Sequence, residues 1–441
     1  MPPALVHIFG LGLPVLEAGA VRPRFSRLDH PAIQSAQVLI GGKEQLAPYA
    51  DHPAEKLLVG KDMEALYAAI QAGYEIGKSQ AVLCGGDPFF FGLGSRLAEK
   101  LGPDALCVYP GTSCLQAAAA LVGLPWEQVR AVSLHGRDDW FALAHALFSA
   151  LPVFVLTDAA STPAVIAAWM LERGLTRYTL HVLESLHLTP EGNFSATAHL
   201  RLTLPGAVVT AFANGPEYGL RVVLIEPDAS LLPAQKAWPF GLNDADVVRE
   251  NKLLTKAPVR AAALAALGIE PWHTVWDLGA GSGAVSLEAA RLAWQGRVYA
   301  VEHKADRAAL IRKNRSRYGA ANLEIVQAKM PGCLPSLEMS GTPHRIFIGG
   351  GLGGNSEDAV QTLTKAWNAL APGGRLAVDC VLLSSLELAR ATLFTLGARI
   401  SVFSLQASTS SPLAGDVRLE ALNPVFLILA EKDDGTYITK N

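Results

Sequence analysis

The stretch WDLGAGSGAVSLEAA, Trp276–Ala290, has the pattern of a buried strand, a glycine-rich loop and the first turns of a helix. Gly279, Gly281 and Ala284 satisfy the G-x-G-x-x-G/A spacing, in which small residues let a loop approach a nucleotide closely. Glu302 follows about twenty residues later, where an acidic side chain accepts hydrogen bonds from a ribose. The stretch therefore predicts a parallel α/β sheet with a ligand site at its carboxyl edge.

Two residues around this loop narrow the choice of ligand. Asp277 stands on the strand just before the loop, and Gly283 extends the pattern to D-x-G-x-G-x-G. A pyrophosphate at a helix N-terminus gains nothing from a nearby carboxylate, because like charges repel. The ammonium group of S-adenosylmethionine would gain from one, and Glu302 would then bind the adenosine ribose. We therefore favour S-adenosylmethionine; a dinucleotide, and a glycine turn that serves only helix–strand contact, stay open as alternatives.

Short apolar runs bounded by turn residues predict strands in both halves of the chain. In the first half, runs that alternate with amphipathic segments lie at 5–10, 38–40, 81–84, 106–109 and 152–156. Later runs with little helix between them predict a partly antiparallel region at 180–183, 198–204 and 220–225. In the second half a helix at 259–267 precedes strands at 274–278, 297–301, 323–326, 345–348, 375–378 and 425–430. The expected fold class is α/β in both halves.

A break in this pattern separates the halves. The stretch Glu226–Asp246 contains three prolines and has no amphipathic period, which is typical of a linker between domains. A chain of 441 residues is long enough for two or three domains. We therefore expect a first domain at 1–228, a linker at 229–245 and a second domain at 246–441.

Composition limits the partners. The net charge is −3, with 17% of residues charged, so no positive excess indicates a nucleic acid. No run of about 18 apolar residues predicts a membrane span, and the first residues lack the basic segment of a leader. The five cysteines are scattered without a C-x-x-C pair, which favours reduced thiols over a zinc site. We expect a cytoplasmic protein without a metal, a nucleic-acid partner or a membrane partner.

The second half resembles the decarboxylating precorrin methyltransferases of cobalamin biosynthesis, which have a Rossmann-like class I methyltransferase fold. The resemblance runs from about residue 241 to residue 388 and is carried by LLTKAPVRAAALAALGI, WDLGAGSGAVSLEAARL, VYAVEHKADRAALIRKN, RIFIGGGLGG and LAPGGRLAVD. It implies an S-adenosylmethionine pocket lined by Thr255, Gly279, Ala280, Gly281, Ser282, Gly283, Glu302 and the region of Met330. Met330 replaces a small residue of the family, and Val381–Ser384 is more apolar than the family's segment, so no catalytic role is carried over.

Two loops of the first half also follow strands. Gly85, Gly86 and Asp87 precede a proline that stops a helix from starting at once. Gly111, Thr112 and Ser113 precede an alanine-rich helix, where Thr112 or Ser113 is expected as the N-cap and Gln116 as its capping-box partner. Taken alone, these are ordinary turns between strands and helices.

In combination, these loops resemble those of the tetrapyrrole methylases, which have two α/β subdomains and bind S-adenosylmethionine without a glycine-rich Rossmann loop. The resemblance covers about residues 5–227 and is carried by LIGGKEQL, CGGDPFFFGLG, YPGTSCLQAAAALVGLPW, SLHGR and LTDAASTPAVIA. It implies cofactor contacts at Gly85, Gly86, Asp87, Gly111, Thr112, Ser113, Thr157 and Asp158. Gly10 and Gly12 would let the backbone approach the macrocycle closely.

Several polar and aromatic residues of the first half admit two interpretations. Arg137 is a candidate for binding a substrate carboxylate or for a surface ion pair. His135 is a candidate acid or base, or a packed histidine. Asp87 either binds the cofactor or caps the Phe89–Gly92 turn, and the three phenylalanines in that turn form a wall for the substrate or part of the core.

Further substrate contacts are expected in the second half. Gly349, Gly350 and Gly351 follow a strand end, where open α/β sheets place ligands, and their amides are candidates for a substrate carboxylate. Lys256 and Arg260 lie near Thr255 and are candidates for the same role. The alternative for both basic residues is a solvated surface charge.

Together the two resemblances imply a fused precorrin methyltransferase with S-adenosylmethionine in two sites, one in each half. They imply methyl transfer to carbons 5 and 15 of precorrin-6B and decarboxylation of the ring C acetate, giving precorrin-8X. The conjugated macrocycle supplies the carbon nucleophile and holds the electrons released on decarboxylation, so the protein's main task is to position the two reactants. A general acid that protonates the ring system is also expected, but the sequence does not identify it. Alternatives are the same reaction on a cobalt-containing precorrin, a transfer RNA adenine methyltransferase, and a corrinoid-binding scaffold with one inactive half. A homo-oligomer would help to enclose the large substrate.

Overall fold

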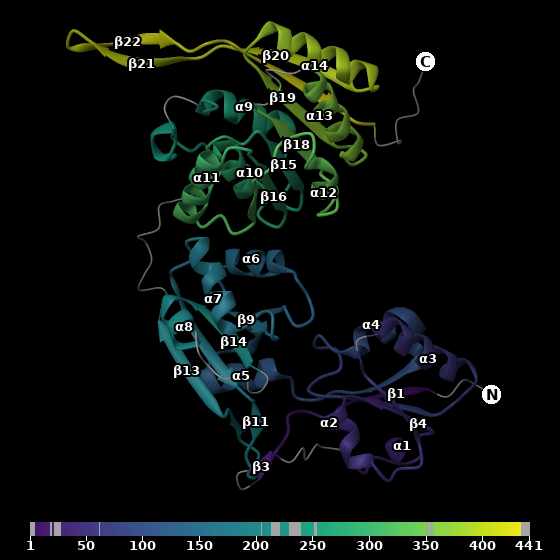
Figure 1. Ribbon diagram of the computed structural model, residues 1–441. Helices are drawn as coiled ribbons and strands as arrows, with labels where there is room; N and C mark the ends of the chain where they lie inside the picture. Colours follow the sequence, from purple (N-terminus) through teal and green to yellow (C-terminus); the bar gives the residue numbers. More distant parts are fainter. Residues whose placement is uncertain are drawn as a thin grey trace. The chain divides into compact units, whose positions relative to one another are not determined.

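The computed structural model describes residues 5–17, 20–21, 28–60, 62–203, 205–212, 221–228, 240–250, 254–349, 352 and 356–433. These residues fall into two compact units (Figure 1). The first unit draws on 1–139, 150–166 and 178–227, and the second on 140–149, 167–177 and 228–441. Two helical segments before residue 178 therefore group with the second unit.

A parallel sheet of five strands forms the first part of the first unit, in the order β5-β4-β6-β1-β7. Its strands are β1 Val6–Gly10, β4 Val38–Gly41, β5 Glu55–Leu58, β6 Gln80–Cys84 and β7 Leu106–Tyr109. The central strands β1, β4 and β6 are apolar and buried on both faces, as expected where helices cover both sides of a parallel sheet. The helices are α1 Pro31–Gln34, α2 Lys43–Leu46, α3 Met63–Glu75 and α4 Leu93–Leu101, and a short ribbon pairs β2 Leu16–Glu17 with β3 Ala20–Val21. The next helix, α5 Cys114–Val122, packs against the sheet that follows.

A second sheet of five strands follows, in the order β13-β10-β14-β9-β8. Its strands are β8 Arg130–Ser133, β9 Val153–Leu156, β10 Tyr178–Glu184, β13 Ala198–Thr203 and β14 Arg221–Pro227. Only the β8–β9 pair in this sheet is parallel, which confirms the antiparallel region that the sequence predicts. The helices are α6 Trp140–Phe148, α7 Pro163–Glu172 and α8 Pro205–Phe212, and β11 His187–Leu188 pairs with β12 Phe194–Ser195.

The second unit contains a seven-stranded sheet in the order β17-β16-β15-β18-β19-β23-β20. Its strands are β15 Thr274–Leu278, β16 Arg297–Val301, β17 Leu323–Val326, β18 Arg345–Ile348, β19 Arg375–Cys380, β20 Arg399–Leu405 and β23 Val425–Glu431. The strands from β15 to β19 run parallel, whereas β23 lies antiparallel between β19 and β20. The parallel strands and β23 confirm the prediction, while β20 was not predicted.

Helices cover both faces of this sheet. On one face, Val275, Phe347 and Ala377 pack with α9 Ala257–Leu267, α10 Ala284–Leu292 and α11 Ala305–Tyr318; we call it the α10 face. On the other, Trp276 and Ile346 pack with α12 Leu334–Glu338, α13 Ser356–Ala369 and α14 Leu383–Thr395. Successive strand residues alternate between the two cores because strand side chains point to opposite faces in turn.

The segment 240–250, which we call the arm, packs against the second unit, although the sequence predicts a linker as far as residue 245. Leu242 is 2% exposed and belongs to the core on the α10 face. The Glu288 carboxylate accepts hydrogen bonds from the backbone amides of Gly241, at 2.9 Å, and Leu242, at 3.0 Å. This part of the predicted linker therefore belongs to the second unit, because its apolar residue is buried there. Residues 229–239 lie outside the described part of the chain.

A long hairpin of β21 Ser408–Leu413 and β22 Asp416–Ala421 extends from the second unit (Figure 1). Almost all of its residues are exposed, among them Leu413, Val417 and Leu419. Within the described ranges, no helix has the length and apolar content needed to cross a bilayer.

Candidate functional site

Three loops at the carboxyl edge of the first parallel sheet meet through glycine backbones. A Cβ atom on Gly10 would lie 2.7 Å from Gly111 Cα and 2.8 Å from the Gly86 carbonyl oxygen. Gly12 and Gly86 also exchange backbone hydrogen bonds, at 3.0 and 3.4 Å. The structure thus brings the predicted glycines together, and the missing side chain of Gly10 makes room for a neighbouring loop. Close approach of the macrocycle to Gly10 stays a prediction.

Asp87 ties two of these loops to each other. Its Oδ1 accepts a hydrogen bond from the Phe89 amide at 2.8 Å, and its Oδ2 accepts one from the Gly111 amide at 3.2 Å. The carboxylate therefore caps the turn, as one of the two interpretations expects, and also fixes Gly111. Its part in cofactor binding stays a prediction.

Ser113 is the N-cap of α5, and Gln116 completes the capping box, as the sequence predicts. The Gln116 amide donates to Ser113 Oγ at 3.3 Å, and the Ser113 amide donates to Gln116 Oε1 at 2.8 Å. The Ser113 hydroxyl is thus engaged within the protein. Thr112 is half-buried, and its backbone faces Gly12 and Gly86.

Thr157 and Asp158 lie after β9 and organise a second loop cluster. The Thr157 hydroxyl donates to the Arg221 carbonyl at 2.5 Å, so this side chain already donates its hydrogen bond within the protein. Asp158 accepts from the amides of Gly136, Ala160 and Ser161 at 2.7 to 2.9 Å, and from the Ser161 hydroxyl. The hydrogen bond from Gly136, followed by those from Ser161 and Ala160, lowers the pKa of Asp158 to about 2.

Arg137 lies between these loops. Its guanidinium stands 5.7 Å from the centre of the Phe91 ring, and its side chain is otherwise exposed. The His135 ring is exposed and shares a hydrogen bond with the Thr157 carbonyl through Nδ1, at 3.0 Å. Phe90 packs against Phe154 in the core, so only its neighbours in the aromatic triplet are exposed.

The glycine loop of the second unit has a different construction. Gly279, Gly281 and Gly283 all have positive φ, at 81°, 59° and 82°, which favours glycine. A Cβ on Gly283 would lie 2.9 Å from Ile311, whereas a Cβ on Gly281 would meet no atom within 4 Å. The amides of Gly279 and Ala280 donate to the Val301 carbonyl at 2.9 and 3.0 Å. The loop is thus anchored at both ends and open at Gly281.

Glu302 lies at the end of β16, beside the open side of the loop, and is 4% exposed. Its Oε2 accepts from the Gly281 amide at 3.0 Å, and its Oε1 accepts from the Lys304 amide at 2.9 Å. His303 Nδ1 lies 3.2 Å from the same Oε1 atom. A carboxylate has lone pairs for further donors, so Glu302 is positioned to accept ribose hydroxyls as the sequence predicts.

Asp277 and Ser282 are buried beside the loop with hydrogen-bonding capacity left over. Asp277 is 1% exposed, and one of its oxygens accepts from the Ser286 hydroxyl. Burial outweighs this hydrogen bond and raises the pKa of Asp277 to about 7. Asp277 Oδ1 and Ser282 Oγ have no hydrogen-bond partner among the described residues. Because buried polar atoms are normally paired, these two atoms suit a ligand with amino and carboxylate groups.

Asn314 connects this loop to the arm. Its amide nitrogen donates to the Ser282 carbonyl at 2.9 Å and to the Val248 carbonyl at 2.8 Å. Its Oδ1 accepts from the Val248 amide at 2.8 Å, and the side chain is fully buried. The arm is therefore part of the structure that holds the loop. The sequence contains no local signal for this residue, because its partners are far away in the chain.

Arg260 is not available to a substrate, which corrects the prediction. The side chain is fully buried and forms ion pairs with Glu288 at 2.6 Å and Asp244 at 3.1 Å. It also donates to the carbonyls of Thr255 at 2.6 Å and Leu242 at 2.5 Å. Arg260 is therefore neither a substrate contact nor a solvated surface charge, because its side chain joins the arm to α10. Lys256 is half-buried just before α9 and remains a candidate.

A neighbouring side chain leaves no room for a Cβ atom at Gly349. A Cβ on Gly349 would lie 2.6 Å from the Phe347 ring, which is 1% exposed. The predicted reason, close approach of the substrate, is therefore not needed to explain this glycine. Gly350 and Gly351 lie outside the described residues.

Asp379 is a functional candidate that the sequence analysis missed. It lies near the end of β19, where the Thr255 hydroxyl donates a hydrogen bond to its carboxyl group. Its Oδ1 is buried without a partner among the described residues. An acidic residue at the end of the apolar run RLAVDC was the available signal, as it was for Asp277 in WDLG.

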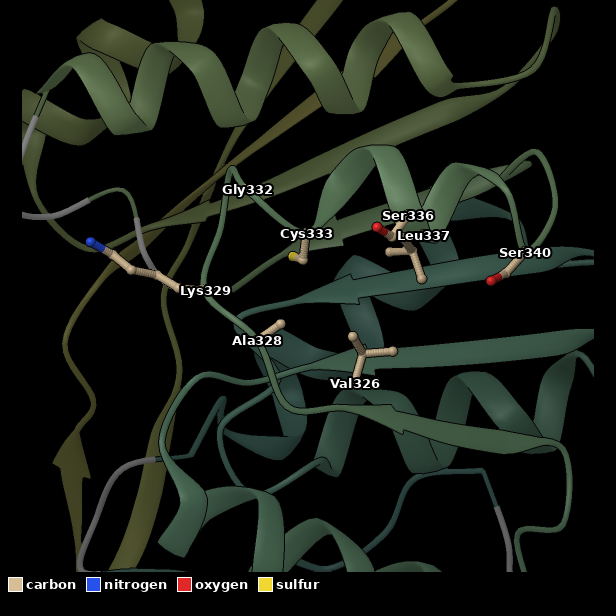
Figure 2. A pocket seen from close by; sticks show the side chains of 8 residues that line it. All are labelled: Val326, Ala328, Lys329, Gly332, Cys333, Ser336, Leu337 and Ser340. Atoms are coloured by element: carbon tan, nitrogen blue, oxygen red, sulfur yellow. The ribbon is translucent and has the colours of Figure 1, made fainter.

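A pocket of about 580 Å³ lies beside the end of β17, lined by Val326, Ala328, Lys329, Gly332, Cys333, Ser336, Leu337 and Ser340. Figure 2 shows the side chains of Val326 and Leu337 facing each other across it, with Lys329 pointing away. The Glu302 amide donates to the Val326 carbonyl at 3.1 Å, so the pocket begins next to Glu302. Met330 packs partly buried against the core on the α12 side, so its neighbours, rather than Met330 itself, line the pocket.

Metal ligands do not gather in the part of the chain that the structure describes. No group of three or more His, Cys, Asp or Glu side chains there could hold an ion. All five cysteines are free.

Two family models match the chain. The model described as "Precorrin methyltransferase domain" matches residues 246–432, and the model described as "Tetrapyrrole (Corrin/Porphyrin) Methylases" matches residues 29–186. The matches fall in the two halves that the glycine loops and the sheets distinguish.

Curated relatives match one or both halves. A precorrin-6Y C(5,15)-methyltransferase [decarboxylating] from Sinorhizobium sp is 30% identical over 79% of this chain and 79% of that protein. A cobalt-precorrin-6B C(15)-methyltransferase (decarboxylating) from Salmonella typhi is 33% identical over 42% of this chain and 92% of that protein. Among solved structures, a precorrin-6y C5,15-methyltransferase from Geobacter metallireducens GS-15 has 32% identity and a TM-score of 0.41, covering 44% of this chain and 98% of that chain.

Proposed function

Because the chain belongs to the family of decarboxylating precorrin-6Y C(5,15)-methyltransferases, we propose that it methylates carbons 5 and 15 of precorrin-6B and decarboxylates the ring C acetate, giving precorrin-8X. The first half methylates carbon 5; the second half methylates carbon 15 and removes carbon dioxide. The observation that carries the proposal is the carboxyl edge of the seven-stranded sheet. There the open Gly281, Glu302 and the unpartnered Asp277 oxygen lie around one loop.

In the second half, this loop would hold S-adenosylmethionine. Glu302 would accept the ribose hydroxyls, and Asp277 Oδ1 and Ser282 Oγ would serve the methionine part. The pocket at Ala328 lies next to Glu302 and suits the adenine. When bound, S-adenosylmethionine supplies an electrophilic methyl group to a carbon nucleophile of the substrate.

In the first half, a second S-adenosylmethionine would lie among the loops of Gly85, Gly86, Asp87, Gly111, Thr112 and Asp158. Most polar side chains of these loops are already engaged, so backbone groups would make most of the contacts. The exposed Arg137 guanidinium would bind a substrate carboxylate, since guanidinium donors match carboxylates bidentately. Lys256 would do the same in the second half.

We further propose that the protein is a cytoplasmic homo-oligomer. The hairpin β21–β22 exposes Val417 to 66% and Leu419 to 78%, and an isolated two-stranded hairpin is only marginally stable in water. A second copy of the chain that covers this hairpin would bury these side chains. Light scattering of the full chain and of a Val417→Ser/Leu419→Ser double variant tests this, and an equal mass for both would contradict a hairpin-mediated oligomer.

The function is tested with the full chain, S-adenosylmethionine and precorrin-6B, using mass spectrometry of the product. We expect two added methyl groups and the loss of one carbon dioxide. A parallel reaction with cobalt-containing precorrin-6B decides which substrate is used. No mass change with either substrate would overturn the proposal, and methyl transfer to RNA would favour the alternative that the net charge of −3 disfavours.

Matched glycine variants test the two cofactor sites. Gly281→Val is expected to abolish methylation at carbon 15 and to leave methylation at carbon 5. Gly397→Val is its control, because Gly397 also has a positive φ and open surroundings but lies after α14. Gly86→Val, with Gly77→Val as its control, is expected to have the converse effect. Calorimetry should count two S-adenosylmethionine sites in the wild type and one in each loop variant; one site in the wild type would contradict the two-site proposal.

A further inference from the structure

Asp379 is a half-buried residue whose Oδ1 atom is buried, and neither the cofactor loop nor the core accounts for it. Its only side-chain hydrogen bond among the described residues comes from the Thr255 hydroxyl, and its Oδ1 has no partner there. A buried polar atom without a hydrogen-bond partner destabilises the folded state. Because the fold retains Asp379 in spite of this destabilisation, its carboxyl group is a candidate for binding or reacting with a ligand.

The register of the sheet places Asp379 at the cofactor edge. Asp277, Phe347 and Ala377 are level with one another on β15, β18 and β19. The strand pairs end one residue later with Leu278, Ile348 and Val378, and Gly279, Gly349 and Asp379 follow these residues directly. Asp379 pairs with Leu427, which belongs to the core on the α10 face, so Asp379 lies on that face. Neighbouring strands are about 4.8 Å apart, so Asp379 lies roughly 10 Å from the start of the loop. A large macrocycle that accepts a methyl group near the loop would reach it.

Three exposed apolar residues follow Asp379 closely in the chain. Val381, Leu382 and Leu383 follow β19 directly and are 57%, 58% and 64% exposed. We call these three residues the apolar shelf. Contiguous exposed apolar side chains are typical of binding surfaces, and a flat macrocycle has an apolar face to place on them.

We propose that Asp379 is the acid that protonates the substrate carbon left by decarboxylation, with the macrocycle held against the apolar shelf. This inference rests on the proposed function of the second half. It assigns a role to Asp379 that the glycine loop and Glu302 do not fill.

The proposed step is balanced in atoms and electrons. The bond between the methylene carbon and the departing carboxylate breaks, and carbon dioxide leaves. The bonding electron pair stays on the substrate, where the conjugated ring system holds it. A proton from Asp379 then forms a new C–H bond and turns the methylene into a methyl group. Asp379 is left as a carboxylate and regains its proton from water.

The surroundings of Asp379 favour the protonated form that this step requires. Burial raises its pKa to about 6, although the hydrogen bond from Thr255 opposes the shift. The neighbouring positions are uncharged: Leu427 pairs with it on β23, Gly349 follows the end of β18, and the first turn of α14 has no acidic residue. On α9, the Arg260 charge is neutralised by Glu288. An acid with a pKa near the working pH is the efficient choice for proton transfer.

The experiment uses the full chain with precorrin-6B and S-adenosylmethionine. We expect Asp379→Asn to slow carbon dioxide loss by at least about a hundredfold, while methylation at carbon 5 continues. In the wild type, the decarboxylation rate should fall as the pH rises through about 6, because the acid form disappears. This falling limb of the pH–rate profile should be absent in Asp379→Asn. It should be present in Asp379→Glu, and that variant should recover part of the decarboxylation rate.

Controls separate this role from a structural one. Substrate affinity, measured without S-adenosylmethionine, and the melting temperature should be nearly unchanged in Asp379→Asn, and a change at the exposed Asp104, Asp104→Asn, should behave as wild type. An unchanged rate and pH profile in Asp379→Asn would overturn the inference, as would a loss of decarboxylation accompanied by lost substrate binding and a lower melting temperature. If the wild type itself neither methylates nor decarboxylates, the proposed function fails instead.

A second variant tests the link to Thr255. Thr255→Val removes a hydrogen bond that favours the carboxylate, so the pKa of Asp379 should rise further. The falling limb of the pH profile should then move to higher pH at saturating S-adenosylmethionine. A limb that stays in place, or moves to lower pH, would contradict the assignment of the limb to Asp379.

Discussion

The glycines of the two units are used in opposite ways. At the carboxyl edge of the first sheet, Gly10, Gly86 and Gly111 allow three backbones to touch, and the carboxylates of Asp87 and Asp158 accept hydrogen bonds from backbone amides of the surrounding loops. In the loop of the second unit, Gly281 borders open space, and polar atoms beside it are left unpartnered.

This difference separates two ways of building a binding site. The first loops complete their hydrogen bonds within the fold, so their shape is set before any ligand arrives and binding adds few new polar contacts. The second loop keeps polar atoms unpaired at a cost of about 1–3 kcal/mol each, and a ligand that pairs with them recovers that cost. Substitutions in the first cluster should therefore act mainly on stability, and those in the second mainly on binding and on the response to pH.

The largest effect is expected from Gly111→Ala. The new Cβ would lie 2.7 Å from the Gly10 carbonyl carbon, so the backbone would have to move. We expect the free energy of unfolding of the first unit to fall by about 3 kcal/mol, which denaturant unfolding with hydrogen exchange would measure. Gly60→Ala, where the nearest atom is 4.0 Å away, should change it by less than about 0.5 kcal/mol. If Gly111→Ala and Gly60→Ala changed the free energy of unfolding equally, the close backbone contact at Gly111 would not be what sets the glycines of the first unit apart.

Asp277→Asn should change how stability responds to pH. Burial raises the pKa of Asp277 to about 7 from 3.8, so the folded protein holds this proton more tightly than the unfolded chain. The resulting stabilisation is complete below about pH 4 and is lost as the pH rises through 7. Between pH 5 and pH 8 the wild type should lose about 2 kcal/mol relative to Asp277→Asn. Parallel stability curves for the two proteins would show that Asp277 is not buried as described.

Gly281→Ala should have a smaller effect on stability than on binding. The site has room for a methyl group, and the positive φ costs about 1 kcal/mol for a residue with a Cβ. We expect S-adenosylmethionine to bind about tenfold more weakly, equal to about 1.4 kcal/mol, measured by calorimetry. Gly397→Ala carries the same backbone penalty and should leave binding unchanged. A tight-binding Gly281→Ala protein would mean that no ligand occupies the open side of the loop.

The smallest effect is expected from Asp158→Asn. The amide of Gly136 is the main cause of the low pKa of Asp158, about 2, so the carboxylate stabilises the folded state above pH 4. This contribution is lost as the pH falls through about 2. Because the group is partly exposed, we expect about 0.5 kcal/mol, seen as faster hydrogen exchange at Gly136 in the variant at neutral pH. Unchanged exchange would show that Asp158 does not hold this loop.

Local patterns predicted the local parts of these sites. The capping box of Ser113 and Gln116 and the order of strand, loop and helix around Gly279 depend on neighbouring residues, and both are confirmed. The hairpin β21–β22 was missed because STSSPL and DVRLEA are exposed on both faces and lack the apolar alternation of a half-buried strand.

The parts that depend on distant residues were not predictable. Arg260 lies near Thr255 in the sequence and was therefore expected at the substrate, but its partner Glu288 is 28 residues away and draws it into the core. Gly349 is a local exception, because the Phe347 ring that it accommodates is only two residues away. Asp379 ends an apolar run that is visible in the sequence, but only the order of the strands places it at the same edge of the sheet as the loop.

The contacts that Arg260 and Glu288 make with the arm determine where the chain can be divided. A fragment that starts at residue 246, the boundary of the family match, keeps Val248 but loses Leu242 and Asp244. Arg260 and Glu288 would then be left in the interior without their arm partners. A fragment that starts before Phe240 retains all of them. Work on the isolated second half should therefore begin upstream of the arm, and a shorter fragment that fails would say little about the methyltransferase itself.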